Sequence, residues 1–235
     1  MEKPVCIITG VGPGTGTALV KRFAQDYRVA MIARDRERLV ALTDEVPDTR
    51  AWSCNVADSD AFADTLEAIA DELGAAKVVV HNAVGGGMVD ILDLEPRILE
   101  RNFRVNTIAL LQLIQACAPA MVEAGAGAIL ATGNTAAYRG RAAFSSFAPT
   151  KAAQRILLES AARSLGPQGV HCCYVAIDAV IDVPWTREYY ADKPDEFFCQ
   201  PEDIAAECFH LAHQPRSAWT FDTVIRLSLI HISEP

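Results

Sequence analysis

Short apolar runs alternate along the chain with stretches in which apolar residues recur every three or four positions. The runs are rich in β-branched residues, and runs this continuous are typical of strands buried on both faces. We expect seven extended segments: Val5 to Thr9, Arg28 to Ala33, Arg50 to Cys54, Lys77 to His81, Ala128 to Thr132, Val170 to Ile177 and Ser217 to Leu227.

The periodic stretches between these runs predict amphipathic helices. Asp58 is expected to cap one of them, and the two longest cover about Asn102 to Val122 and Thr150 to Leu165. Pro119 is expected to kink or end the first of these, and Gly166-Pro167 closes the second. Strand and helix alternating in this way imply one doubly wound parallel sheet with helices on both faces.

Composition narrows the class of protein. A length of 235 residues suits a single α/β domain, and we find no repeat or linker. Asp and Glu number 30 against 21 Lys and Arg, so the net charge of -9 disfavours nucleic acid and anionic lipid as partners. No apolar run approaches the ~18 residues of a membrane span, and no signal peptide is recognisable. We therefore expect no membrane partner and a cytoplasmic protein.

The cysteines argue against a metal site. Seven are scattered along the chain without a C-x-x-C pair or a histidine at zinc spacing. Most are expected to be small buried apolar residues in a reducing compartment, with Cys172 and Cys173 facing opposite sides of one strand.

A glycine-rich turn, Thr9-Gly-Val-Gly-Pro-Gly-Thr-Gly16, follows the first expected strand and leads directly into a helix. A helix N-terminus offers free N–H groups and a favourable dipole to a pyrophosphate, and glycines allow close approach. Strict G-x-G-x-x-G spacing fails because Thr15 stands at the third position; the spacing present is T-G-x-x-x-G-x-G. The alternative is that the segment is only a tight strand-to-helix turn and does not bind a pyrophosphate.

These residues make the chain similar to the short-chain dehydrogenase/reductase family over nearly its whole length. Besides the glycine turn, His81-Asn82-Ala83-Val84 matches the family's N-N-A-G, Asn106 its helix asparagine and Lys151 the lysine of its Y-x-x-x-K. The resemblance implies a Rossmann-type domain over residues 1–226 with strand order 3-2-1-4-5-6-7 and a nicotinamide cofactor across the carboxyl ends of the strands. The cofactor-binding residues it implies are Gly10, Gly12, Gly14, Thr15, Gly16, Arg34, Asn55, Val56, Asn82, Ala83 and Lys151.

The end of the second strand bears on which nicotinamide cofactor binds. The resemblance implies an Asp there for the ribose 2′-hydroxyl of NAD, but the strand ends in Ala33 and Arg34 follows. A cation suits the 2′-phosphate of NADP, so we expect NADP(H) to be preferred over NAD(H). The alternative is that Arg34 does not bind a cofactor and only forms a surface ion pair with Asp35 or Glu37.

The catalytic pattern departs from the family. Counting back from Lys151 places Phe147 where the resemblance implies the proton-donating Tyr, and Asn134 where it implies a Ser. We therefore expect the catalytic positions to be Lys151, Asn106, Asn134 and Phe147. Losing general acid–base help typically costs about 10²–10⁴-fold in rate. Four residues could donate the proton in place of the tyrosine, although residues of these types more often have a structural role. They are Ser145, Ser146, Tyr138 and His81.

The segment after the sixth strand is expected to cover the substrate pocket. Asp182 stands where the family has a Thr beside the cofactor, and it either turns away or binds a substrate donor. An aromatic lid would favour an apolar or aromatic substrate, whereas the alternative is a loop that packs its own rings together. Its aromatic residues are Trp185, Tyr189, Tyr190, Phe197 and Phe198.

Two functions remain open from the sequence. The first is an NADP(H)-dependent oxidoreductase that reduces a carbonyl or related group of a small substrate; the second is a non-catalytic NADP(H)-binding sensor or scaffold. The long helices carry more apolar surface than one sheet face covers, and the resemblance implies a homodimer or homotetramer. Residues 227–235 resemble translated adaptor sequence, and we leave them out of the expected fold as a non-native tail.

Overall fold

A seven-stranded parallel sheet forms the centre of the protein, in a computed structural model that describes residues 2–227. The strand order is β3-β2-β1-β4-β5-β6-β9, which confirms the expected order, since β9 is the seventh strand of the sheet. The strands are β1 (Val5–Thr9), β2 (Arg28–Ala33), β3 (Thr49–Ser53), β4 (Ala76–His81), β5 (Gly127–Gly133), β6 (Val170–Asp178) and β9 (Asp222–Arg226).

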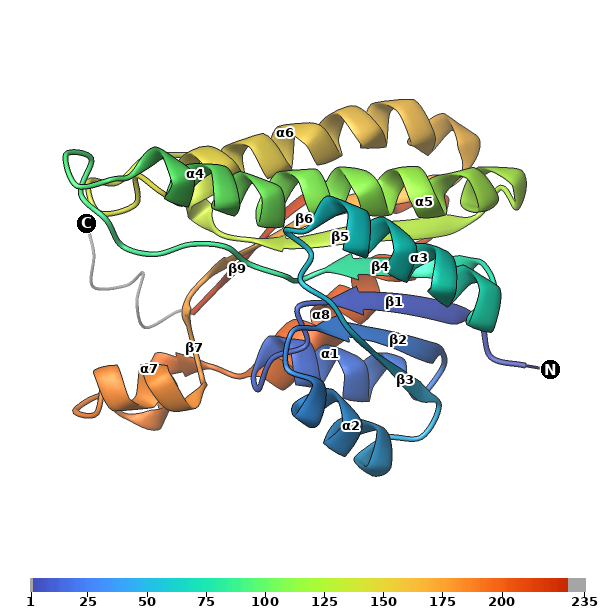
Figure 1. The fold of residues 1–235 in the computed structure, drawn as a ribbon, viewed down its shortest axis with the longest axis horizontal. Helices are drawn as coiled ribbons and strands as arrows, with labels where there is room; N and C mark the ends of the chain where they lie inside the picture. The colour runs from blue at the N-terminus through green and yellow to red at the C-terminus, as the bar shows by residue number, and fades with distance from the viewer. Residues whose placement is uncertain (1, 228–235) are drawn as a thin grey trace.

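Helices cover both faces of this sheet, as Figure 1 shows. One face carries α3 (Ser59–Leu73), α5 (Ala109–Glu123) and α6 (Ala148–Leu165), and the other carries α1 (Thr15–Phe23), α2 (Arg36–Glu45) and α8 (Pro201–Ala212). The expected cap of α3 is confirmed, because the Asp58 carboxylate accepts from the Ala61 N–H at 3.2 Å.

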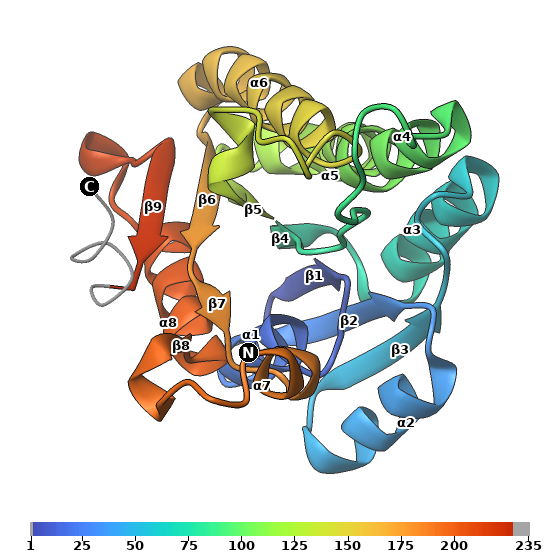
Figure 2. The ribbon, with the colours of Figure 1, turned by 90° about the vertical axis from the view of Figure 1, so that its left-hand side faces the viewer.

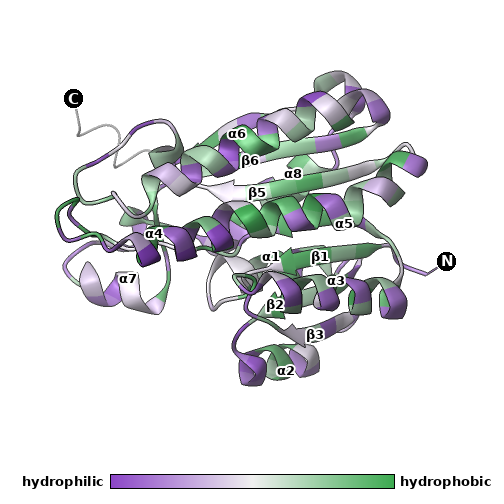
Figure 3. Ribbon diagram, turned by 45° about the horizontal axis from the view of Figure 1, so that its top comes forward, coloured by the Kyte–Doolittle hydropathy of each residue, from purple (hydrophilic) through white to green (hydrophobic). Residues whose placement is uncertain are grey.

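Two apolar clusters fill the spaces between sheet and helices. Phe62 and Leu113 belong to one cluster and Phe23 and Leu39 to the other, and each of these side chains is fully buried. In Figure 3 the central strands β1 and β5 are hydrophobic, whereas α3 alternates between hydrophobic and hydrophilic residues, as a half-buried helix must. All seven cysteines are buried and unpaired, and Cys172 and Cys173 lie in opposite clusters, as expected.

The first long helix differs from its expected form. It begins at Pro96 as α4 (Pro96–Phe103), widens into a π-helical turn (Arg104–Ile108) and continues as α5 through Pro119 to Glu123, so the proline does not end it. The stretch Pro96–Glu123 is the one described helix long and apolar enough to cross a membrane. It contributes buried residues such as Leu110 to the domain core, which is the behaviour of a core helix.

The segment 180–199, which we call the lid, contains elements that the periodicity did not predict. Two short strands, β7 (Val180–Ile181) and β8 (Phe198–Cys199), pair with each other and hold α7 (Pro184–Tyr189). Figure 1 shows α4 and α7 at the same end of the molecule, past the carboxyl end of β1, and Figure 2, which faces that end, shows them on opposite sides of β1. The last strand is shorter than expected because residues 216–218 form a helical turn, and of the expected tail only Leu227 lies within the described residues.

Candidate cofactor and active site

The glycine turn at the end of β1 is shaped by two close backbone contacts. Gly10 has a φ of +73°, and a Cβ there would lie 2.4 Å from the Ala83 backbone nitrogen. At Gly16 a Cβ would lie 2.4 Å from the Gly10 carbonyl oxygen. Neither position accepts a side chain without displacing the backbone, so both glycines set the path of the chain into α1.

The other two glycines of the turn differ: Gly12 faces open space and Gly14 lies against the lid. A Cβ on Gly12 would meet nothing within 4 Å, while one on Gly14 would lie 2.3 Å from Cγ1 of Val183 in the lid. Thr15, the first residue of α1, has a buried hydroxyl without a hydrogen-bond partner among the described residues. An open approach at Gly12 and an unpaired hydroxyl at a helix N-terminus suit a pyrophosphate.

A chain of hydrogen bonds joins the glycine turn to the ends of β4 and β5. The Asn82 side chain donates to the Gly10 carbonyl oxygen at 2.9 Å and accepts from the Thr132 hydroxyl at 2.8 Å. The Lys151 amine donates to the Thr132 carbonyl oxygen at 3.2 Å. Asn82 is therefore a brace of the site, with both ends of its carboxamide engaged.

The expected adenosine end lies past β2 and β3. Arg34 is exposed, and Asp35 does not neutralise it, because Asp35 caps α2 and pairs with Arg38 at 3.0 Å. No ion-pair partner of Arg34 lies within residues 2–227. Asn55 is exposed with its Oδ1 accepting from the Ala57 N–H at 3.2 Å, and Val56 is buried.

Lys151 is almost completely buried, at 2% exposed, between α6 and the end of β5. Its amine donates to Thr132 and, at 2.9 Å, to Oε1 of Gln154, whose own amide donates to the Asn106 carbonyl oxygen at 2.8 Å. Burial lowers the pKa of Lys151 to about 7. Asn106, in the π-helical turn, uses its side chain to hold Gly85 and the Thr150 hydroxyl.

Of the two departures from the family pattern, Phe147 lies near the Lys151 amine and Asn134 follows the end of β5. The Phe147 ring centre is 5.7 Å from the Lys151 amine, and the ring lies against Gly86, where a Cβ would be 2.8 Å from Cδ2 of the ring. Asn134 donates to the Ile177 carbonyl oxygen and accepts from the Ala136 N–H, each at 2.9 Å. Its side chain therefore bridges β5 and β6, and neither residue offers a hydroxyl.

His81 does not carry a transferable proton. Its Nε2 donates to the Val105 carbonyl oxygen at 3.0 Å, so its Nδ1 accepts from the Thr9 hydroxyl at 2.9 Å. The ring is fully buried, and burial, followed by the nearby charge of Lys151, lowers the pKa of His81 to about 3. The imidazole is neutral at physiological pH and both of its nitrogens are used within the fold.

The three hydroxyl groups that could replace the tyrosine as proton donor also donate hydrogen bonds within the fold. Ser146 is fully buried and donates to the Gly87 carbonyl oxygen at 2.9 Å, and Ser145 donates to the Ala142 carbonyl oxygen at 3.2 Å. Tyr138 donates to Asp222, and burial followed by this bond raises its pKa to about 12. None of the three is held as an available acid.

The carboxylate of the lid residue Asp182 is bonded to Arg187 of the lid and to Gln200, which directly follows the lid. Its carboxylate receives two bonds of 2.6 Å from Arg187 and one of 3.0 Å from Gln200, and the bond from Arg187 lowers the pKa of Asp182 to about 2. Arg187 also pairs with Asp195 and lies 4.0 Å from the centre of the Phe198 ring. Asp182 therefore stabilises the lid through its contacts with Arg187 and Gln200.

Comparison with known proteins agrees with this arrangement. Residues 4–193 match the family model described as short chain dehydrogenase. The chain belongs to this family. A Sus scrofa protein named carbonyl reductase (NADPH) 2 is 31% identical over 228 residues, covering 91% of this chain and 90% of that protein. A Sarocladium schorii protein named oxidoreductase asL5 is 28% identical over 93% of this chain and 92% of its own.

Solved structures of short-chain dehydrogenases share the fold. A metagenomic short-chain oxidoreductase in complex with NADP superposes with a TM-score of 0.83 at 26% identity, covering 97% of this chain and 98% of that one. An alcohol dehydrogenase of Thermococcus sibiricus complexed with 5-hydroxy-NADP gives a TM-score of 0.84 at 22% identity, which shows the fold alone.

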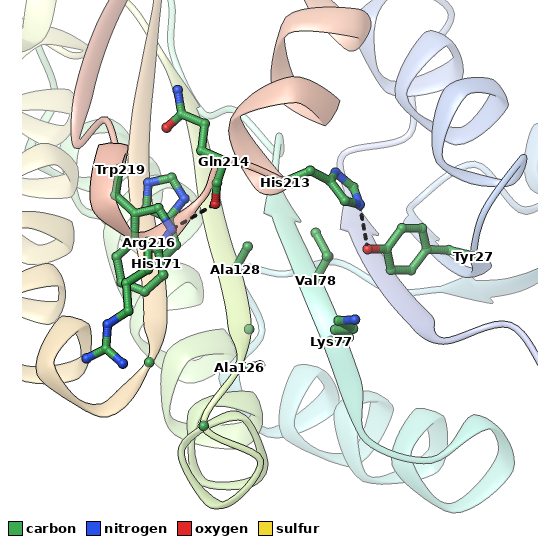
Figure 4. A pocket seen from close by; sticks show the side chains of 14 residues that line it. Tyr27, Lys77, Val78, Ala126, Ala128, His171, His213, Gln214, Arg216 and Trp219 are labelled. Atoms are coloured by element: carbon green, nitrogen blue, oxygen red, sulfur yellow. Dashed lines mark hydrogen bonds between the residues drawn. The ribbon is translucent and has the colours of Figure 1, made fainter.

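A cavity of about 330 Å³ lies at the opposite end of the sheet, by the amino ends of β4 and β5 (Figure 4). Lys77 and Val78 line one side of it, His213 bonds to the Tyr27 hydroxyl at 2.9 Å, and Trp219 stacks on His171. It is separate from the glycine turn. No group of metal-ligating residues occurs in the part of the chain that the structure describes.

Gln154 is the site residue that the sequence motifs did not identify. Its position, three residues after Lys151, places it one turn along the same face of α6. A polar side chain on the buried face of a helix usually has a specific hydrogen-bond partner. That spacing is the signal by which it could have been found.

Proposed function

We propose that this short chain dehydrogenase is an NADP(H)-dependent oxidoreductase that reduces a carbonyl or related group of a small, apolar substrate without the usual tyrosine. The proposal is supported by the hydrogen-bond chain from Gly10 through Asn82 and Thr132 to Lys151, which connects the glycine turn to a buried amine at one edge of the sheet. The Sus scrofa relative has carbonyl reductase and NADPH in its name, which supports the same reaction class. When bound, the nicotinamide would supply the hydride.

The preference for NADP(H) rests on Arg34. Arg34 directly follows β2, and its side chain is exposed to solvent. The nearby carboxylate of Asp35 does not pair with it, because Asp35 pairs with Arg38. A 2′-phosphate would supply the missing negative charge, and its oxygens match the planar donors of Arg.

Fluorescence titrations of NADPH and NADH test this preference. The native protein should bind NADPH more tightly, and Arg34→Ala should weaken NADPH while leaving NADH nearly unchanged. Arg50→Ala is the matched control, because Arg50 lies near the amino end of β3 and its exposed guanidinium contacts Glu72 and the Thr49 carbonyl oxygen. Equal affinities in the native protein would contradict the proposal.

An apolar substrate is supported by exposed apolar side chains beside the site. Val84, directly after the Asn82-Ala83 brace, is 64% exposed, and Trp185 in α7 is 67% exposed. Most of the other lid rings pack on each other, Tyr190 on Phe197 at 5.3 Å among them, whereas Trp185 makes no ring contact with the described residues. Trp185 is therefore the lid ring left to meet a ligand.

The alternative is a protein that binds NADP(H) as a sensor without turnover. It is favoured by one observation: the carboxamide of Asn134 is bonded to Ile177 and Ala136, so this position offers no hydroxyl to a carbonyl. Consumption of NADPH with a broad panel of aldehydes and ketones decides between the two. Tight NADPH binding with no substrate-dependent oxidation would favour the sensor.

A further inference from the structure

The ammonium group of Lys151 has one more N–H donor than there are oxygen atoms to accept its hydrogen bonds. An ammonium carries three N–H donors, and within residues 2–227 it reaches two oxygens, the Thr132 carbonyl at 3.2 Å and Gln154 Oε1 at 2.9 Å. No carboxylate among these residues forms an ion pair with it. A buried donor left without a partner is costly, so the third N–H is available to a ligand.

Every other group considered as an acid is engaged elsewhere. His81 is neutral with both nitrogens bonded, and the hydroxyls of Ser145 and Ser146 donate to carbonyl oxygens of the backbone. Tyr138 donates to Asp222. The Lys151 amine lies 5.7 Å from the centre of the ring of Phe147, the residue that stands where the family pattern has a tyrosine.

We propose that Lys151 is itself the proton donor of the reduction, and that Gln154 is the positioning residue that holds its amine. This inference rests on the proposed function. Gln154 is fully buried and spans the gap between the amine and the Asn106 carbonyl oxygen, so its carboxamide orientation is fixed from both ends. Its Oε1 therefore always faces the amine.

The surroundings suit an acid that works near neutral pH. Burial without a counter-charge lowers the pKa of Lys151 to about 7, and general acids work best when their pKa is close to the ambient pH. The charged or titratable group that faces the amine from β4 is His81, which is neutral. From β5, α6 and the π-helical turn, the facing groups are the neutral Thr132, Gln154 and Asn106.

The step balances with NADPH as the reductant. The carbonyl carbon accepts the hydride of NADPH, and the carbonyl oxygen accepts the proton of the Lys151 ammonium. An O–H bond forms as one N–H bond breaks, which leaves the alcohol, NADP⁺ and a neutral amine. Solvent then returns a proton to the amine for the next turnover.

Two substitutions of Gln154 should move the pH profile in opposite directions. Gln154→Glu places a carboxylate beside the amine and raises the pKa of Lys151, so the fall of kcat/KM on the alkaline side moves to higher pH. Gln154→Leu removes an acceptor that favours the charged amine, so the same limb moves to lower pH. Gln168→Leu, on an exposed helical turn, should leave the profile in place. If both Gln154 variants keep the native profile, the positioning role is wrong.

A second measurement does not depend on turnover. Lysine labelled with ¹³C at Cε reports each amine's titration by NMR, with Lys151→Met assigning the signal and exposed Lys77 as the internal control. The Lys151 amine should titrate near neutral pH in the native protein. An amine that stays charged above pH 9 would overturn the inference even if NADPH is bound and consumed.

Charge-preserving replacement completes the test. Lys151→Arg keeps the positive charge but cannot release a proton, so it should lose at least about 10²-fold in kcat, as Lys151→Met should. Substantial activity in Lys151→Arg would overturn the inference and leave the proposed reductase standing. A Lys151 amine that titrates near neutral pH in a protein that binds NADPH but reduces nothing would instead contradict the proposed function, and with it the inference.

Discussion

Asn134 donates to the carbonyl oxygen of Ile177 at 2.9 Å and so joins the carboxyl end of β5 to that of β6. The position that the family pattern gives to a catalytic serine is therefore used to hold two strands together. The same side chain caps the following helical turn by accepting from the Ala136 N–H. A change at Asn134 alters the fold as well as the chemistry, and any test of the site must separate the two.

The first prediction concerns a double variant that restores the two hydroxyl groups of the family pattern. Phe147→Tyr with Asn134→Ser should raise carbonyl reduction by about 10²-fold or more, because the nearby Lys151 charge favours the phenolate and lowers the pKa of the new tyrosine. Loss of the Asn134 bond to Ile177 should cost about 0.5–1.5 kcal/mol of stability. Turnover with NADPH and a carbonyl panel measures the gain.

The controls for this double variant are its stability and its NADPH affinity. Phe147 is partly buried against Gly86, so a hydroxyl without a partner there would cost about 1–3 kcal/mol. Phe147→Tyr alone keeps the Asn134 bridge and shows which substitution is responsible for any loss. A folded, NADPH-binding double variant that reduces nothing would count against the reductase and favour the sensor.

The framework of the fold could be predicted because local sequence determines it. β1 and β2 occupy their expected residues, since both are continuous apolar runs closed by a turn, and Asp58 caps α3 because a short acceptor precedes an amphipathic stretch. The seven-strand order came from the resemblance, and the structure confirms it.

The chemistry of the site could be predicted less well because it depends on contacts between distant residues. The neutrality of His81 follows from its complete burial, and its two nitrogens are bonded to Thr9 and Val105, which are remote in sequence. The sequence leaves Asp182 open between two roles, and only the structure shows that Arg187 binds its carboxylate. No motif identifies either partner.

The second prediction compares two glycines of the same turn. Gly10→Ala forces a side chain into a φ of +73° and onto the Ala83 backbone, so it should destabilise the protein by about 1–3 kcal/mol or more. Gly12→Ala meets open space and should leave stability nearly unchanged while weakening NADPH, since its methyl group enters the approach to α1. Urea unfolding and fluorescence titration measure the two effects. Undiminished NADPH affinity in Gly12→Ala would argue against a pyrophosphate at that position.

The third prediction concerns assembly. Ile108 in the π-helical turn is 40% exposed and Ile156 in α6 is 56% exposed, so apolar surface remains on the outer side of the long helices. We expect a homodimer or homotetramer in which these helices pair, and Ile156→Glu should dissociate it. Val40→Glu, at an equally exposed valine of α2, should not. A native monomer at micromolar concentration in sedimentation would disprove the prediction.

The last prediction follows from the buried imidazole of His81. Burial holds its pKa at about 3 in the folded protein against an ordinary value of 6.5, so between these values the unfolded chain binds a proton that the folded chain excludes. Stability should therefore fall as the pH drops below 6.5, with a slope of up to about 1.4 kcal/mol per pH unit from this residue. His81→Gln, which does not titrate, should flatten the dependence between pH 7 and pH 5, where carboxylates contribute little. His210→Gln, at an exposed histidine of α8, should retain the native slope. Urea unfolding across this range measures both variants, and an unchanged slope in His81→Gln would show that the imidazole is not held neutral by the fold.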